Sequence, residues 1–361
     1  MNSLNVDAIG ADSLNEVERF IPVKGRILVI TSPSLIRHGL LDKLLEHIDS
    51  KRTLLYDSVK SNPSIVEIDN AISKYSHLNI RCIIAIGGGS VIDFGKILSV
   101  TLPLGLDKPL AKILNQEIKL SEIEKIRLVS IPSTAGSGAE VTPFSTIWDY
   151  ENKNKYSINS IDLIPDIIIL DPKLTSTQNE QLTVISAMDA ISHSLESIWN
   201  RYATPKSIDL AFRALEFLIE NLPLAIKNPN NLNARLGMQK GALLAGRAIS
   251  ITRTSVAHSI SYPLTSYYQV PHGLACGFTL IELLKINMSS LKSTYPNNQD
   301  ILERALLVIQ SLNLADRILH FASAKQILEL EPLMYKEGRI DNYMSEVGLN
   351  INSIISSSLI K

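Results

Sequence analysis

The chain has 361 residues, with 35 basic and 36 acidic side chains and a net charge of −1. Hydrophobic residues make up 45% of the sequence and charged residues 20%, proportions that are typical of folded globular proteins and exclude an intrinsically disordered chain. The balanced charge gives no sign of a nucleic-acid or anionic-membrane surface, and no run approaches the roughly 18 continuous apolar residues of a membrane-spanning helix. The length corresponds to about two domains of about 150 residues each.

The cysteines and the N-terminal residues indicate the cellular compartment. Cys82 and Cys276 lie far apart in the sequence and show neither metal-ligand nor redox spacing, so we expect a reducing environment. The first twenty residues carry acidic side chains and no apolar core, so neither a secretory signal nor a transit peptide is expected. The sequence therefore predicts a cytoplasmic protein that binds neither nucleic acid nor membrane.

Short apolar runs rich in Ile and Val alternate with helical patterns in the first half of the chain. The expected strands are Arg26–Thr31, Thr53–Tyr56, Arg81–Ile86, Arg127–Ile131 and Asp166–Leu170. Leu35–Ile48 and Ile65–Tyr75 have helical periodicity. Such alternation is typical of a parallel sheet covered by helices on both faces.

Strand patterns fade from about Ser176, and long helical periodicities follow. Proline and turn residues cluster at Asp171 and Pro172, which places the boundary close by. The sequence therefore predicts an α/β, doubly wound (Rossmann-like) domain over residues 1–174 and an all-α domain over residues 175–361.

Two glycine-rich loops follow expected strands of the first domain. Gly87-Gly-Gly-Ser90 comes directly after one strand, and Ile131–Thr142 (IPSTAGSGAEVT) continues from another. Glycines let a backbone approach a ligand closely, and the amides of a following helix start favour a pyrophosphate. Each loop alone is equally compatible with a tight strand-to-helix turn, and the ordinary GxGxxG fingerprint is absent. Two such loops at the carboxyl ends of strands in one sheet favour a nucleotide site.

The segment Thr183–Glu196 is apolar enough for a helix buried on most sides, yet Ser186, Asp189, His193 and Glu196 fall on one stripe. Asp189 and His193, at positions i and i+4, have the spacing to chelate one cation. The alternative is a hydrogen-bonded pair on a solvated face. A carboxylate on an otherwise apolar helix needs a partner, and a metal ion supplies one.

Two more histidines lie further along the chain. A single helix is expected to run from Arg247 through Tyr262, with Thr254, His258 and Tyr262 on one face, and His272 follows a turn proline. Taken alone, each histidine is compatible with a core position satisfied by a backbone hydrogen bond. Together with Asp189 and His193 they form a donor set suited to Fe²⁺ or Zn²⁺, to which no cysteine is expected to contribute.

Five separated motifs carry a family resemblance. GGGSVID-GK, IPSTAGSGAEVT, ILDPKLT, MDAISHSLE, and AHSISYP followed by VPHG occur in this order between about Lys24 and about Leu284. In this the chain resembles the iron-containing (group III) alcohol dehydrogenases, relatives of dehydroquinate synthase and glycerol dehydrogenase. The last seventy-odd residues carry none of these motifs.

The resemblance implies a dehydroquinate synthase-like fold, a bound iron or zinc ion, and NADH or NADPH as the hydride donor. Asp189, His193, His258 and His272 fall on the metal ligands of the family. The implied nucleotide contacts are Gly87, Gly88, Gly89, Ser90, Asp93, Thr134, Ser137 and Lys155. A homodimer is a further implication. His258 would act at the catalytic centre as a ligand, and Tyr262, or a water that it orients, would provide the proton.

Two positions depart from the family pattern. Tyr262 stands where many members have a further histidine, four residues after the third ligand. Ser32 stands where an aspartate often pairs with the adenosine ribose hydroxyls. Because Ser32 carries no charge to repel a 2′-phosphate, NADPH becomes at least as suitable as NADH. Arg37 or Lys60 could contact that phosphate.

Within the family, residues 155–205 and 254–265 are most similar to the phosphonoacetaldehyde reductases. The expected substrate is therefore a small anionic aldehyde, with sulfoacetaldehyde as the nearest alternative to phosphonoacetaldehyde. Such an anion needs cationic or hydroxyl donors, and the candidates are Arg201, Arg247, Arg253, Thr254 and Ser255. The alternatives are a general alcohol dehydrogenase, a dehydroquinate synthase-like lyase, and a non-catalytic nucleotide-binding protein.

Overall fold

The computed structural model describes residues 6–152, 154–344 and 348–360, and the chain divides into two compact units. The first unit comprises residues 1–134 and 139–177, and the second comprises residues 135–138 and 178–361. The division at residues 177 and 178 lies beside the boundary predicted at residue 174. The short stretch Ala135–Gly138, inside the second glycine-rich loop, belongs to the second unit.

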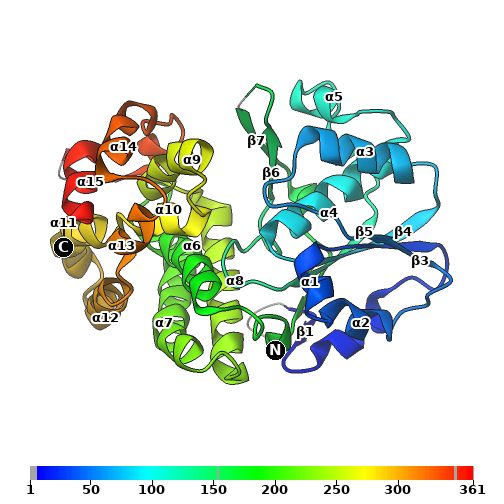
Figure 1. Ribbon diagram of the computed structural model, residues 1–361, viewed down its shortest axis with the longest axis horizontal. Coiled ribbons are helices and arrows are strands. Elements are labelled where there is room, and N and C mark those ends of the chain that lie inside the picture. The colour runs from blue at the N-terminus through cyan, green and yellow to red at the C-terminus, as the bar shows by residue number, and fades with distance from the viewer. Residues whose placement is uncertain (1–5, 153, 345–347, 361) are drawn as a thin grey trace. The chain divides into compact units, whose positions relative to one another are not determined.

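The first unit is built on a parallel sheet in the order β1-β8-β5-β4-β2-β3 (Figure 1). Its strands are β1 (Ala8–Ile9), β2 (Arg26–Ile30), β3 (Thr53–Tyr56), β4 (Ile80–Gly87), β5 (Arg127–Pro132) and β8 (Ile167–Leu170). All five predicted strands are present, and the α/β doubly wound prediction is confirmed. The two-residue strand β1 was missed because it is too short to show a pattern.

The residues of β4 explain why an apolar run becomes a strand here. Cys82, Ile84 and Ile86 pack in one hydrophobic cluster, whereas Ile83 and Ala85 pack in another. Because successive side chains of a strand point to opposite faces, a strand buried on both faces must be apolar throughout. One cluster includes residues of α3 (Ile65–Tyr75) and α4 (Gly89–Thr101), and the other includes residues of α1 (Pro33–Arg37) and α2 (Leu40–Leu45).

Two details of the first unit differ from the prediction. The helix expected over Leu35–Ile48 is divided into α1 and α2 because Gly39 adopts a left-handed conformation with φ of 64°. An antiparallel hairpin of β6 (Phe144–Asp149) and β7 (Asn154–Asn159) was not predicted. Its strands mix polar and apolar side chains and are only partly buried, so the apolar signal was weak. The remaining helix of this unit is α5 (Leu110–Leu114).

The described residues of the second unit form helices and no multi-residue strand, which confirms the predicted all-α domain. The helices are α6 (Glu180–Ile198), α7 (Pro205–Lys227), α8 (Leu232–Thr252), α9 (Val256–Tyr268), α10 (His272–Gly277), α11 (Leu280–Thr294), α12 (Gln299–Gln310), α13 (Leu314–Leu319), α14 (Ala324–Glu329) and α15 (Ile351–Leu359). Figure 1 shows α6, α7 and α8 as the long helices of this unit.

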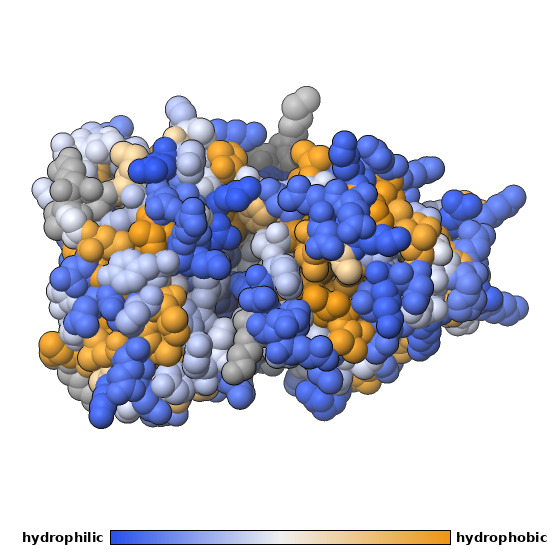
Figure 2. Space-filling model, turned by 90° about the horizontal axis from the view of Figure 1, so that it is seen from above, coloured by the Kyte–Doolittle hydropathy of each residue, from blue (hydrophilic) through white to orange (hydrophobic). Residues whose placement is uncertain are grey.

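The surface has an ordinary mixture of residues. Figure 2 shows hydrophobic residues lying between hydrophilic ones on the face that it presents. Exposed large apolar side chains come from separate elements, among them Val23, Ile161 and Leu307. Scattered apolar residues of this kind are usual on protein surfaces. Among the described helices, none combines the length and the hydrophobicity that crossing a membrane would require.

Candidate metal centre

Helix α6 supplies Asp189 and His193. The helix begins after Asn179, whose side chain accepts a hydrogen bond from the backbone amide of Leu182. Most of its residues from Thr183 onward are buried, and many of them are Ser or Ala, which let neighbouring helices approach on every side. Asp189 and His193 lie one turn apart on this buried helix, as their spacing predicted.

His258 and His272 come from two short helices, and here one prediction is wrong. The single helix expected from Arg247 to Tyr262 is two helices, α8 and α9, separated at Arg253, whose φ is 63°. His258 therefore lies one turn from the start of α9, and His272 is the first residue of α10. Arg247, Arg253, Thr254 and Ser255 do not share the helix of His258, so the faces assigned to them from a continuous helix do not apply.

The four predicted ligands lie together within the second unit. The Oδ1 atom of Asp189 is 3.5 Å from the Nε2 of His193, 3.7 Å from that of His258 and 3.9 Å from that of His272. The two Nε2 atoms of His193 and His258 are 3.1 Å apart. Donors about 2.1 Å from a tetrahedral ion lie about 3.4 Å from one another, so these separations fit one shared ion.

The chemistry of this cluster (Asp189, His193, His258 and His272) also fits a cation. Asp189 Oδ1 is buried and has no hydrogen-bond partner among the described residues. A buried carboxylate oxygen without a partner is costly, and a metal ion removes that cost. Nitrogen and oxygen donors of this kind suit Fe²⁺ or Zn²⁺. The buried, unpartnered oxygen of Asp189 therefore supports a cation site in a way that the residue types alone could not.

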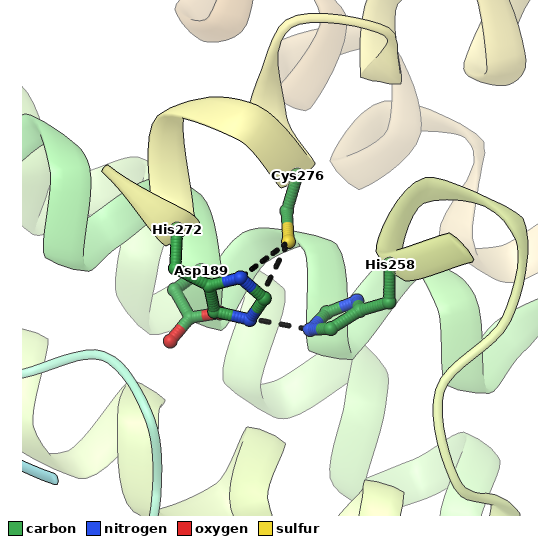
Figure 3. Close-up of side chains that lie close together, drawn as sticks. All are labelled: Asp189, His258, His272 and Cys276. Carbon is green, nitrogen blue, oxygen red and sulfur yellow. Dashed lines mark hydrogen bonds and ion pairs between the residues drawn. The ribbon is translucent and has the colours of Figure 1, made fainter. Parts of the chain in front are cut away.

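Cys276 lies beside the cluster, contrary to the expectation that no cysteine would. Its Sγ atom is 3.8 Å from Nδ1 and 3.7 Å from Nε2 of His272, one turn earlier in α10. Donor atoms of Asp189, His258, His272 and Cys276 all lie within 4.8 Å of one another, and Figure 3 shows these side chains converging. The spacing of four residues between His272 and Cys276, about one helical turn, is the sequence feature that indicates this contact.

Glu196 lies on the same stripe of α6 as Asp189 and His193, and its role was not predicted from the sequence. Its side chain is fully buried, and its Oε2 lies 2.6 Å from the Nδ1 of His258. Its Oε1 accepts a hydrogen bond from the backbone amide of His258. A carboxylate bound to the far nitrogen of a metal-ligating histidine fixes the orientation and tautomer of the ring. Glu196 therefore holds His258 with Nε2 directed at Asp189.

The electrostatics of the cluster agree with these roles. Burial would raise the pKa of the Asp189 carboxyl, but the nearby histidines hold that pKa below its usual value. Burial lowers the pKa of His193 to about 4. Burial also opposes ionisation of Glu196, yet the proximity of His258 lowers the carboxyl pKa. Asp189 and Glu196 are thus carboxylates, and His193 is a neutral imidazole able to bind a cation.

The glycine that follows His272 is required by the packing of α10 against α6. A Cβ atom at this position would overlap the backbone carbonyl oxygen of Ile185 in α6. Only glycine therefore lets α10 lie directly against α6 at this level. That close approach brings His272 to within reach of Asp189.

Comparison with known proteins identifies the family. The family model described as iron-containing alcohol dehydrogenase matches residues 8–172, and the C-terminal model of the same family matches residues 183–333. This chain belongs to the iron-containing alcohol dehydrogenase family. A phosphonoacetaldehyde reductase of Streptomyces viridochromogenes is 34% identical over 56% of this chain and 52% of its own length. An NADPH-dependent butanol dehydrogenase of Clostridium saccharobutylicum is 26% identical over 84% of this chain and 81% of its own.

Solved structures agree with the fold. A crystal structure of an iron-containing alcohol dehydrogenase has a TM-score of 0.79 and 27% identity, covering 98% of this chain and 97% of its own. A sulfoacetaldehyde reductase from Bifidobacterium kashiwanohense, solved in complex with NAD⁺, has a TM-score of 0.84, covers 98% of this chain and 96% of its own, and is 22% identical. At 22% identity, the similarity to the sulfoacetaldehyde reductase shows a shared fold alone. The match to the Streptomyces relative spans about half of that protein's length.

In this member of the iron-containing alcohol dehydrogenases, most residues predicted to bind the nucleotide gather at one edge of the sheet. Ser32 follows β2, the stretch from Gly87 to Ser90 leads from the end of β4 into α4, and Thr134 follows β5. Because β4 lies between β2 and β5, the three strand ends are adjacent. The amide of Ser133 donates to the carbonyl of Gly87, which joins the two loops. Gly88 precedes the first turn of α4, so helix amides are available to an anion there.

Asp93 and Lys155 have structural contacts of their own. Asp93 accepts a hydrogen bond from the amide of Thr146 and pairs with the buried Lys96 at 3.5 Å. Lys96 Nζ donates to the carbonyls of Thr142 and Phe144. Lys155 lies on β7 with its Nζ 5.6 Å from the centre of the Trp148 ring. The structure thus shows Asp93 and Lys96 attaching the β6–β7 hairpin to α4. Ser137 belongs to the second unit.

The residues predicted to bind substrate do not form one group. Arg201 and Arg253 are exposed, and among the described residues neither side chain forms an ion pair. Arg247 is half-buried on α8, and Ser255 is buried immediately before α9. Thr254 is also buried, and its carbonyl accepts a hydrogen bond from Asn342. Tyr262 lies on α9 with its ring parallel to that of His272, the ring centres 6.4 Å apart.

Proposed function

We propose that this chain catalyses the metal-dependent, NAD(P)H-linked reduction of a small aldehyde to its primary alcohol. The observation that carries the proposal is the convergence of three imidazole Nε2 atoms on one unpartnered, buried carboxylate oxygen of Asp189. Membership of the iron-containing alcohol dehydrogenase family supports it. We further propose Fe²⁺ as the ion, with Zn²⁺ as the alternative, because the donor set suits both.

The chain's own residues have distinct parts in this reaction. A bound ion would polarise the aldehyde oxygen, and the nicotinamide would deliver the hydride to the carbonyl carbon. Glu196 keeps the proton of His258 on Nδ1, which leaves Nε2 free to bind the ion. The Tyr262 hydroxyl oxygen accepts a hydrogen bond from Arg339 Nε at 3.1 Å, and a phenol that accepts can also donate. We propose that this hydrogen, or a water that it orients, protonates the product oxygen.

The first candidate substrate is phosphonoacetaldehyde, reduced to 2-hydroxyethylphosphonate, and sulfoacetaldehyde is the second. The Streptomyces relative is named a phosphonoacetaldehyde reductase, which supports the first. A general alcohol dehydrogenase is a third candidate, supported by the butanol dehydrogenase relative. A lyase of the dehydroquinate synthase type has less support, because the sequence shows no dense set of lysines and arginines for a polyhydroxy acid. A non-catalytic nucleotide-binding protein has less support because all four predicted metal ligands are present. A cytoplasmic homodimer remains a prediction.

The metal-loaded protein assayed with NADPH and a panel of aldehydes tests the proposal. We expect kcat/KM for phosphonoacetaldehyde to exceed that for propanal, a neutral aldehyde of similar length, by about 10²-fold or more, because a pocket built for an anion leaves its donors unpaired with a neutral substrate. Sulfoacetaldehyde should lie between the two. Equal kcat/KM values for propanal and phosphonoacetaldehyde would indicate a general alcohol dehydrogenase. No reduction of any aldehyde would contradict the proposal as a whole.

The nucleotide preference is a separate prediction. Ser32 occupies the N-cap position of α1, two residues after β2, and as a neutral residue it does not repel a 2′-phosphate. We therefore expect NADPH to be used at least as well as NADH, and Ser32→Asp to shift the ratio of kcat/KM toward NADH by roughly tenfold. Ser34→Asp, two residues on and exposed, is the control for a general charge effect. A wild-type protein that strongly prefers NADH would show that Ser32 does not select the nucleotide.

Arg37 and Lys60 are the two cations that the sequence suggested as contacts of the 2′-phosphate. Arg37 is exposed in the last turn of α1. Lys60 is exposed and lies 3.6 Å from Glu67. The expected use of NADPH depends on Ser32 and on neither of these two residues.

A further inference from the structure

A segment beyond the matched family regions is attached to the helix that carries His258. The C-terminal family match ends at residue 333, and residues 334–343, here called the C-terminal segment, follow it. Ser259 Oγ donates to the carbonyl of Met334 and accepts from the amide of Lys336 at 2.9 Å. Asn342 Nδ2 donates to the carbonyl of Thr254 at 2.9 Å. The C-terminal segment is therefore hydrogen-bonded to α9 and to the residues just before it.

This attachment places Arg339 against Tyr262, which neighbours His272 of the metal cluster. The Nε of Arg339 donates to the hydroxyl of Tyr262 at 3.1 Å, and the Tyr262 ring lies parallel to that of His272. The side chain of His272 is 35% exposed, whereas those of His193 and His258 are 6% and 4% exposed. His272 and Tyr262 thus mark the open side of the cluster, and Arg339 lies on that side.

The guanidinium of Arg339 has unused donor capacity. Besides its bond to Tyr262, it donates from Nη1 to the carbonyl of Gly338. In the parts of the chain that the structure describes, no carboxylate pairs with it. Arginine presents five N–H donors in a planar fork that matches phosphonate and sulfonate oxygens. A half-buried cation with free donors beside a metal cluster fits an anionic ligand.

We propose that Arg339 binds the anionic head group of the substrate, and this inference rests on the proposed reduction of a small anionic aldehyde. In phosphonoacetaldehyde one carbon atom separates the carbonyl carbon from phosphorus, so the anion must lie within a few ångströms of the reacting carbonyl. The Arg339–Tyr262 contact puts a cation beside the residue proposed to protonate the product. Arg339 replaces Arg201 and Arg253 in this role, since neither forms a hydrogen bond from its side chain to Tyr262.

Two variants of the metal-loaded enzyme separate anion binding from support of Tyr262. Arg339→Ala removes both the charge and the donor to Tyr262, whereas Arg339→Gln removes the charge and keeps an amide donor. In both variants we expect kcat/KM for phosphonoacetaldehyde to fall about 10²-fold, mainly through KM. Reduction of propanal should change by less than about threefold in Arg339→Gln. Lys336→Ala, which removes a neighbouring exposed cation of the same segment, should leave both substrates unaffected.

A binding measurement without turnover completes the test. Methylphosphonate should inhibit propanal reduction competitively in the wild type and lose about tenfold or more in affinity in Arg339→Gln, with metal content and melting temperature unchanged. A wild type that favours phosphonoacetaldehyde while both variants keep that preference would overturn the role of Arg339 alone. A wild type with no preference for the anion would overturn the proposed substrate and Arg339 together. Equal losses for propanal and phosphonoacetaldehyde in Arg339→Gln would show a role in positioning Tyr262 and overturn anion binding.

Discussion

Replacing His258 or His272 with alanine is expected to abolish stoichiometric metal binding and aldehyde reduction together. Each change removes one of three imidazoles whose Nε2 atoms lie 3.5 to 3.9 Å from Asp189 Oδ1, and leaves Asp189 with fewer partners. Loss of the ion removes several kcal/mol of stabilisation from the reacting oxygen, so the rate should fall by about 10³-fold or more. Metal content of the purified variants, measured with the rate, checks both parts.

Two matched variants test whether these four residues are the ligands. His320→Ala removes an exposed histidine of the same unit and should keep full metal content and activity. Cys276→Ser leaves Asp189 and the three imidazoles intact, so it should also retain the ion. Full metal occupancy in His258→Ala and His272→Ala would refute the ligand assignment. Loss of the ion in Cys276→Ser would instead make the thiolate a ligand.

Gly273→Ala is expected to have the second large effect, although the added methyl group carries no chemistry. Its Cβ would overlap the carbonyl oxygen of Ile185, and because that obstacle is backbone, α10 must move away from α6. His272 begins α10 and would move with it, away from Asp189. We expect activity to fall about 10²-fold, as a displacement of about 1 Å at a reacting centre can cause, and the free energy of unfolding to fall by about 1–3 kcal/mol.

Gly348→Ala is the control for this substitution. A Cβ at Gly348 meets nothing within 4 Å, so the same chemical change should leave stability and activity as they are. The measurements are denaturant unfolding and titration of the metal-free protein with Fe²⁺ or Zn²⁺. An unchanged metal affinity in Gly273→Ala would show that the position of α10 does not control the cluster.

The alternation of strands and helices in the first unit was predictable because it depends on local patterns. Strands such as β4 are buried on both faces, so their apolar character is continuous and visible in sequence. The helix Thr183–Glu196 was predictable for a similar reason. The break between α8 and α9 was not, because Arg253 is neither glycine nor proline, and its positive φ of 63° is held by the surrounding fold.

Periodicity, residue type and spacing are properties of the chain, so they were enough to predict the α/β and all-α organisation and the donor chemistry of the metal cluster. The tertiary structure was required to bring these donors together, with Glu196 orienting His258 and Cys276 beside them. It also decided that Arg339, 77 residues after Tyr262, lies against the Tyr262 hydroxyl. Contacts between distant residues depend on how helices pack, and helix packing is set by many weak contacts that no single motif records.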